Sequence, residues 1–71
     1  MERLTELRML SILHKAGARR ISTEKKFAGL FAWFTFDGAA HVWKIRKDAF
    51  VQNFEADVAR ELGEELKQKV A

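Results

Sequence analysis

The sequence predicts a small α+β domain with an N-terminal helix, an antiparallel sheet of two or three strands, and a C-terminal helix, in the order αββα or αβββα. Three observations lead to this fold class. Apolar residues recur with helical spacing near the N-terminus, and they do so again near the C-terminus. Between these segments, an Asp-Gly pair lies between two aromatic, β-favouring runs. A chain of 71 residues buries only about 60% of the surface that its unfolded form exposes, so we expect a single domain covering residues 1–71.

The first helix is expected at residues 3–16, where apolar side chains recur on one helical face. The centre of its buried stripe is predicted to be Leu7, Leu10 and Leu13, flanked by Met9, Ile12 and Ala16. Gly17 is expected to end this helix, because glycine enters the left-handed region without a Cβ clash.

The middle of the chain predicts a β-hairpin. Asp37 and Gly38 suit the two central positions of a type I′ turn, with strands at about 27–36 and 40–46. This turn sets the register, with the cross-strand pairs Phe36/Ala39, Phe34/His41, Ala32/Trp43 and Leu30/Ile45. A helix over 27–36 is the alternative, since four apolar residues from Phe27 to Phe34 also have helical spacing.

Alternation along the hairpin divides its side chains between two faces. The face expected to pack against the helices carries Leu30, Ala32, Phe34, Phe36, Trp43 and Ile45. The other face carries Phe31, Trp33, Thr35, Val42 and Lys44, which leaves aromatic side chains open to water. Because a two-stranded ribbon is marginally stable alone, a third strand is expected at about 19–23.

The second helix is expected at residues 48–69, with Asp48 as its N-cap. An apolar residue recurs at every fourth position, in the row Phe50, Phe54, Val58, Leu62, Leu66 and Val70. Each step of four residues rotates about 40° around a helix, so one straight face cannot bury the whole row. We expect the members up to Leu62 to pack on the core, and Leu66 and Val70 to wrap around its edge or contact another chain.

Charge is distributed unevenly among the thirteen basic and ten acidic residues of the chain. Residues 15–47 contain eight basic and two acidic side chains, a formal charge of +6. Residues 48–71 contain three basic and six acidic side chains, a formal charge of −3. A concentrated positive charge attracts phosphate groups, anionic lipid or an acidic protein surface.

Catalytic and metal-binding patterns are sparse. Neither His14 nor His41 has an acid or a serine at a spacing that forms a triad, an acid/base pair or a metal site, and the four glycines are scattered singly. The chain has no cysteine, so neither a disulfide framework nor a thiolate site is expected. We therefore expect no enzyme activity, cofactor, metal ion or small-molecule substrate.

The N-terminus lacks the pattern of a secretory signal, which makes a cytoplasmic location the expectation. The longest apolar run, at residues 27–36, is too short to span a membrane.

The basic pair Arg46-Lys47, followed by Asp48-Ala49, lies where the last helix is predicted to begin. Together with the predicted element order, this resembles the double-stranded RNA-binding domain, which carries a basic pair at the start of its last helix. The order is also similar to that of small HicA-type toxins. The chain departs from both patterns: Gly38-Ala39-Ala40-His41 lacks the Gly-His pair of these toxins, and the long loop that follows the first strand of the RNA-binding domain is absent. The resemblance therefore implies architecture and not activity.

Two functions from different classes follow from these patterns. The first is a small non-enzymatic regulatory or inhibitory protein-interaction module, a homodimer formed through the aromatic sheet face, of the kind that phages also encode. Its predicted contact residues are Phe31, Trp33, Val42, Leu66 and Val70. The second is a small protein that binds DNA or RNA, in which aromatic rings stack on bases and cations neutralise phosphates. Its predicted contact residues are Arg19, Arg20, Lys25, Lys26, Lys44, Arg46 and Lys47.

Overall fold

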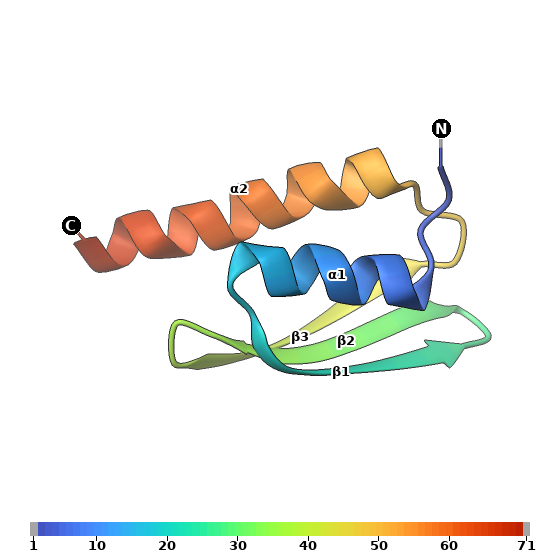
Figure 1. The fold of residues 1–71 in the computed structure, drawn as a ribbon, viewed down its shortest axis with the longest axis horizontal. Coiled ribbons are helices and arrows are strands. Elements are labelled where there is room, and N and C mark those ends of the chain that lie inside the picture. Colours follow the sequence, from blue (N-terminus) through green and yellow to red (C-terminus); the bar gives the residue numbers. More distant parts are fainter. Residues whose placement is uncertain (1, 71) are drawn as a thin grey trace.

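The computed structural model describes the backbone of residues 2–70 and their side chains, except those of residues 65 and 67–70. Its elements are α1 (Glu6–Ala16), β1 (Arg19–Lys26), β2 (Gly29–Phe36), β3 (Ala39–Arg46) and α2 (Val51–Val70). The strands form one antiparallel sheet in the order β1-β2-β3. Both helices lie on the same face of this sheet (Figure 1). The domain is therefore a two-layer αβββα fold, which confirms the predicted fold class.

The hairpin between β2 and β3 has the predicted turn and register. Asp37 and Gly38 have φ values of 51° and 83°, and a type I′ turn requires positive φ at both of its central residues. All of the predicted cross-strand pairs occur, from Phe36 opposite Ala39 to Leu30 opposite Ile45. The helical alternative for this segment is wrong.

The hairpin between β1 and β2 differs from the prediction. Residues 27 and 28 form a turn, so β2 begins at Gly29, and β1 extends to Lys26. Phe27 is 96% exposed at this turn. A Cβ at position 29 would collide with the backbone carbonyl oxygen of Ile45, so only glycine permits this close approach of β2 to β3. The strand predicted from residue 27 was wrong because Phe and Ala carry no turn signal.

The start of β1 contains an irregularity. Arg19 lies opposite Thr35 and Ser22 lies opposite Trp33, so β1 holds one residue more than β2 between these two pairs. Arg20 lies within this bulge and has a φ of 54°. Such bulges bend a strand and increase its local twist.

Helix α1 begins at Glu6, three residues later than predicted. Thr5 caps it, because its Oγ1 accepts a hydrogen bond of 3.2 Å from the backbone N–H of Arg8. The preceding residues are extended and pair with the segment before α2, where Leu4 N–H donates to the Ala49 carbonyl at 2.9 Å. At the other end, Gly17 adopts a φ of 106° and terminates the helix as predicted.

The buried face of α1 is rotated from the predicted one. Met9 and Leu13 are fully buried, whereas Leu7 is 79% exposed and Leu10 is also exposed. Leu7 lies about 160° around the helix from Met9, at 3.6 residues per turn. Apolar residues are so frequent in this segment that their spacing does not identify a single buried face. The helix packs against the sheet with the face that carries Met9.

Asp48 was predicted to be the N-cap of the second helix, but α2 begins at Val51, so this prediction is wrong. The carbonyl of Phe50 accepts the helical hydrogen bond of Phe54 N–H at 3.1 Å, which places Phe50 at the N-cap. Asp48 instead lies in the turn after β3, where it pairs with Arg46 at 3.5 Å. Leu66 is 45% exposed, as expected of a row that rotates away from the core.

The hydrophobic core fills the space between the helix layer and the sheet. No polar or charged residue is buried in the part of the chain whose side chains are described. The buried side chains are Leu4, Met9, Leu13, Ala18, Leu30, Ala32, Phe34, Phe36, Ile45, Val51, Phe54, Val58 and Leu62. The predicted inner face of the hairpin belongs to this core, with Trp43 partly buried at its side.

Candidate functional site

The helices leave the opposite face of the sheet uncovered, and we call this the outer face (Figure 1). Side chains alternate along each strand, so the outer face receives every second residue. Its members are Ser22, Glu24 and Lys26 from β1, Phe31, Trp33 and Thr35 from β2, and Ala40, Val42, Lys44 and Arg46 from β3.

Two aromatic rings lie side by side at the centre of the outer face. The ring centres of Phe31 and Trp33 are 6.0 Å apart, and their planes differ by 22°. Trp33 is 38% exposed and Phe31 is partly exposed, so both rings can be reached from solvent. The sequence-based assignment of these two residues to the face away from the helices is confirmed.

Cations from both flanking strands approach the Phe31 ring. The Nζ of Lys26 lies 5.1 Å from the ring centre, and the Nζ of Lys44 lies 5.9 Å from it. Both distances are within the range of a cation–π attraction. Lys26 also pairs with Glu24 at 3.8 Å, whereas Lys44 forms no ion pair with the residues that the structure describes.

The outer face has a charged half and an uncharged half. Glu24, Phe31 and Lys44 are aligned across the three strands, and Lys26 and Arg46 lie in the next row toward the same end. This end is the charged half. The other half has the aligned residues Ser22, Trp33 and Val42, followed by Thr35 and Ala40. We call it the uncharged half, although Arg19 at the start of β1 lies opposite Thr35 at its end. Val42 is 62% exposed, so the uncharged half presents apolar surface next to Trp33.

The seven basic residues predicted for nucleic-acid binding do not form one surface. Lys26, Lys44 and Arg46 lie on the charged half of the outer face. Arg19 and Arg20 begin β1 and therefore lie at the opposite end of the sheet, roughly 23 Å away at about 3.3 Å per residue.

Two further basic residues lie near the charged end but beside the helix layer. Lys25 and Lys47 line a hollow that they share with Leu4 and Leu7. Lys47 also places its Nζ 5.6 Å from the ring centre of Phe27.

The residues predicted for protein contact are also divided. Phe31, Trp33 and Val42 come together on the outer face. Leu66 belongs to α2, in the layer on the other side of the sheet, and the side chain of Val70 lies outside the described residues. Figure 1 shows that the C-terminal part of α2 projects past the hairpin between β2 and β3. One contact surface cannot include Leu66 together with Trp33.

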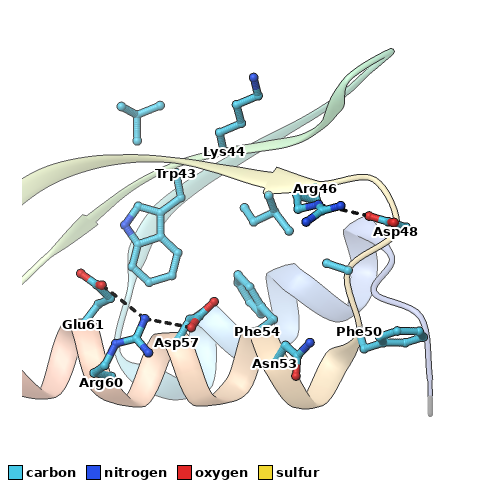
Figure 2. A pocket seen from close by; sticks show the side chains of 13 residues that line it. Trp43, Lys44, Arg46, Asp48, Phe50, Asn53, Phe54, Asp57, Arg60 and Glu61 are labelled. Carbon is cyan, nitrogen blue, oxygen red and sulfur yellow. Dashed lines mark hydrogen bonds and ion pairs between the residues drawn. The ribbon is translucent and has the colours of Figure 1, made fainter.

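Sequence reasoning missed a groove between β3 and α2, which we call the β3 groove. It has a volume of about 680 Å³. Trp43 points from β3 toward α2, and its ring lies edge to face with that of Phe54 at 6.0 Å (Figure 2). Arg60 lies along the α2 side, where it pairs with Asp57 at 2.9 Å and Glu61 at 3.6 Å. The only signal in the sequence was Trp43, which alone could not locate a groove formed by two distant segments.

The described residues contain no group of three or more His, Asp or Glu side chains that could hold a metal ion. His14 is exposed in the last turn of α1, and His41 stacks on Phe34 with ring centres 5.2 Å apart. None of the helices, over the part of the chain that is described, has the length and apolar character needed to cross a membrane.

Comparisons with protein-family models, with curated proteins and with solved structures found no match to this chain. Function must therefore be argued from the surfaces themselves, since a fold alone does not imply one. Among the described surfaces, the outer face brings exposed aromatic rings and cations together.

Proposed function

We propose that the chain is a small non-enzymatic binding protein whose outer face binds single-stranded nucleic acid. The observation that carries this proposal is the Phe31 ring, which lies near the Lys26 and Lys44 ammonium groups and beside the exposed indole of Trp33. Every base has a π face that stacks on an aromatic ring, and the phosphates of the same strand attract nearby cations. The charged half supplies both features within adjacent rows of the sheet.

The dimensions of the outer face suit a short single strand. Eight-residue strands are roughly 23 Å long, and three strands spaced about 4.8 Å apart are roughly 14 Å wide. Two neighbouring rings can receive two bases, and each base that stacks on an aromatic side chain contributes about 1–3 kcal/mol. We therefore expect the face to bind a few nucleotides with little sequence preference and with strong salt dependence.

The charges of the outer face argue against a stable homodimer made by stacking two of these faces. Lys26 and Lys44 of both copies would lie within that interface, and lysine is depleted in interfaces relative to the rest of a protein surface. Nucleic-acid binding is thus favoured over self-association through this face.

Protein binding is the second candidate function, because the uncharged half exposes Val42 beside Trp33. Exposed apolar patches on small domains are typical of protein contacts. A partner with an apolar anchor next to acidic side chains would complement both halves of the face. In that case the chain would act as a regulatory or inhibitory module.

The decisive experiment measures fluorescence anisotropy of short labelled single-stranded DNA and RNA of mixed sequence, first at low salt. Lys44→Glu and Lys15→Glu change the net charge equally, but Lys15 lies in the last turn of α1, in the helix layer. We expect Lys44→Glu to weaken binding by about tenfold or more, which is about 1.4 kcal/mol, and Lys15→Glu to weaken it much less. Equal losses would indicate unspecific attraction to the whole protein. Absence of binding by the unmodified chain at low salt would end the proposal.

A further inference from the structure

The two free edges of the sheet differ in how well they are protected from pairing. The β1 edge begins with the bulge between Arg19 and Ser22 and ends with Lys25 and Lys26. Bulges and lysines are devices by which proteins prevent edge strands from pairing with other chains. In contrast, β3 pairs with β2 without irregularity over its whole length. It also carries cations near its end, Lys44 and Arg46, but residues 39–43 include no acidic or basic side chain except His41.

We propose that the β3 edge pairs with β3 of a second copy of the chain, so that two domains share one six-stranded antiparallel sheet. Such a pairing is isologous, with one two-fold axis perpendicular to the sheet. It satisfies the outward-pointing backbone N–H and C=O groups of β3, which are otherwise open at the edge of the sheet.

Symmetry and the strand pleat restrict the register to a few possibilities. Directly opposite residues must point to the same face, so one residue faces its own copy and the axis passes midway between these two copies. We call this residue the axis position. Val42 and Trp43 are the two axis positions that pair the most residues of β3. Val42 is favoured because it is apolar and exposed, whereas Trp43 already packs edge to face on Phe34 and Phe54.

Charge along the strand is compatible with this register. With Val42 at the axis, Lys44 lies opposite Ala40 of the second copy, and Arg46 lies opposite Gly38, which is outside β3. No like charges meet along β3. A corresponding pairing of two β1 strands would place Arg20 opposite Lys26 for an axis at Thr23. For an axis at Ser22 it would place Arg19 opposite Lys25, with Arg20 opposite Glu24. Like charges directly opposite each other destabilise a strand pair, so the second copy fits β3 and not β1.

The inner side of the proposed pairing adjoins the β3 groove. His41 would lie opposite Trp43 of the second copy, and the small Ala39 would lie opposite Ile45. The groove leaves unfilled volume beside Trp43, between β3 and α2 (Figure 2). Inner-face side chains of the second strand can enter this volume, which makes the pairing more than a row of backbone hydrogen bonds.

The pairing goes beyond the proposed function and does not depend on it. It leaves the outer face uncovered and extends its uncharged half across the axis, in the order Trp33, Val42, Val42, Trp33 over the two copies. All measurements below are made without nucleic acid. Their failure therefore leaves the anisotropy experiment unaffected, and failure of that experiment leaves the pairing unaffected.

A disulfide cross-link tests the pairing and its register. The chain has no cysteine, so Val42→Cys introduces a single thiol. Opposite residues of an antiparallel pair have Cα atoms about 4.5–5.5 Å apart, which lies within the range of a disulfide. We expect a covalent dimer on a non-reducing gel after mild oxidation of the full chain.

Thr35→Cys is the matched control, because Thr35 lies on the outer face but on the central strand. In the proposed dimer its two copies are separated by three strand spacings across the sheet, roughly 14 Å, and by four residues along the strands, roughly 13 Å, which is too far for a disulfide. A monomeric Val42→Cys protein, or equally rapid cross-linking of Thr35→Cys, would overturn the proposal.

A pair of charge variants at Ala40 tests the same contact without a covalent bond. Ala40 is exposed on β3. In the proposed dimer each Ala40 faces Lys44 of the other copy, so this contact occurs twice. Sedimentation equilibrium should show that Ala40→Lys raises the dimer dissociation constant roughly 2- to 30-fold and that Ala40→Glu lowers it by a similar factor. A monomeric unmodified chain at high protein concentration, or the same response to both variants, would contradict the pairing.

Discussion

Trp33 and Val42 are directly opposite each other on neighbouring strands, and both side chains lie on the outer face. Trp33 belongs to the central strand, where its indole is 6.0 Å from the ring centre of Phe31. Val42 belongs to the free edge strand. A nucleic-acid ligand that uses the rings and a second copy of the chain that uses Val42 would therefore occupy adjacent parts of one sheet. The two proposals are compatible, and the variants that test them are distinct.

Phe54→Ala is expected to destabilise the domain strongly. Phe54 is buried between the layers, where its ring packs against that of Trp43. Truncation of a buried phenylalanine costs about 3–5 kcal/mol in the free energy of unfolding, because it removes apolar contacts and leaves a cavity. Urea unfolding at fixed protein concentration measures this value. Phe27→Ala is the control and should change stability by less than about 0.5 kcal/mol, because Phe27 is exposed at a turn. Equal losses in the two variants would contradict the packing described for Phe54.

Two glycine-to-alanine substitutions are expected to have opposite effects. Gly29→Ala places a Cβ against the backbone oxygen of Ile45 at a φ of 150°, so we expect a loss of roughly 2 kcal/mol or more. Gly63 is helical and has open space where a Cβ would be, so Gly63→Ala should stabilise the domain by about 0.5–1 kcal/mol. Chemical denaturation of both variants measures the sign of each change in the free energy of unfolding. A stable Gly29→Ala protein would mean that β2 and β3 are farther apart at this position.

Thr5→Ala is expected to reduce stability by about 1 kcal/mol through loss of the α1 cap. The Thr5 hydroxyl accepts the Arg8 N–H, which has no other partner in the first turn of the helix. For a domain of this size, such a loss lowers the Tm by about 4–8 °C, which circular dichroism detects. Ser11→Ala is the control, since Ser11 is exposed in the same helix and alanine favours helix formation. An unchanged Tm for Thr5→Ala would show that the cap contributes nothing.

The sequence predicted elements with a strong local signal better than elements fixed by distant contacts. Asp37-Gly38 determines a turn by its own backbone preferences, so the register of β2 and β3 followed from it. The residues of the Phe27-Ala28 turn carry no such signal, and the close approach of Gly29 to the Ile45 backbone is a contact between distant segments. The rotation of α1 likewise depends on which side meets the sheet.

The candidate site was predictable in part for the same reason. Alternation along β2 is a local property, so the placement of Phe31 and Trp33 on one face followed from the strand assignment. The grouping of the basic residues on one surface was predicted wrongly, because β1 is extended and places Arg19 and Lys26 at opposite ends of the sheet. The β3 groove was not predictable, since its shape depends on where α2 crosses β3.

The two tryptophans allow the ligand to be located by fluorescence. Trp33→Phe keeps an aromatic ring on the outer face and leaves Trp43 as the single indole, whereas Trp43→Phe leaves Trp33. If nucleic acid stacks on the outer face, it should quench the emission of Trp33 in Trp43→Phe and change the emission of Trp43 in Trp33→Phe little, because Trp43 points to the helix layer (Figure 2). Anisotropy with both variants establishes that each still binds. Quenching of Trp43 alone would instead place the ligand in the β3 groove and would show that the outer face does not bind it.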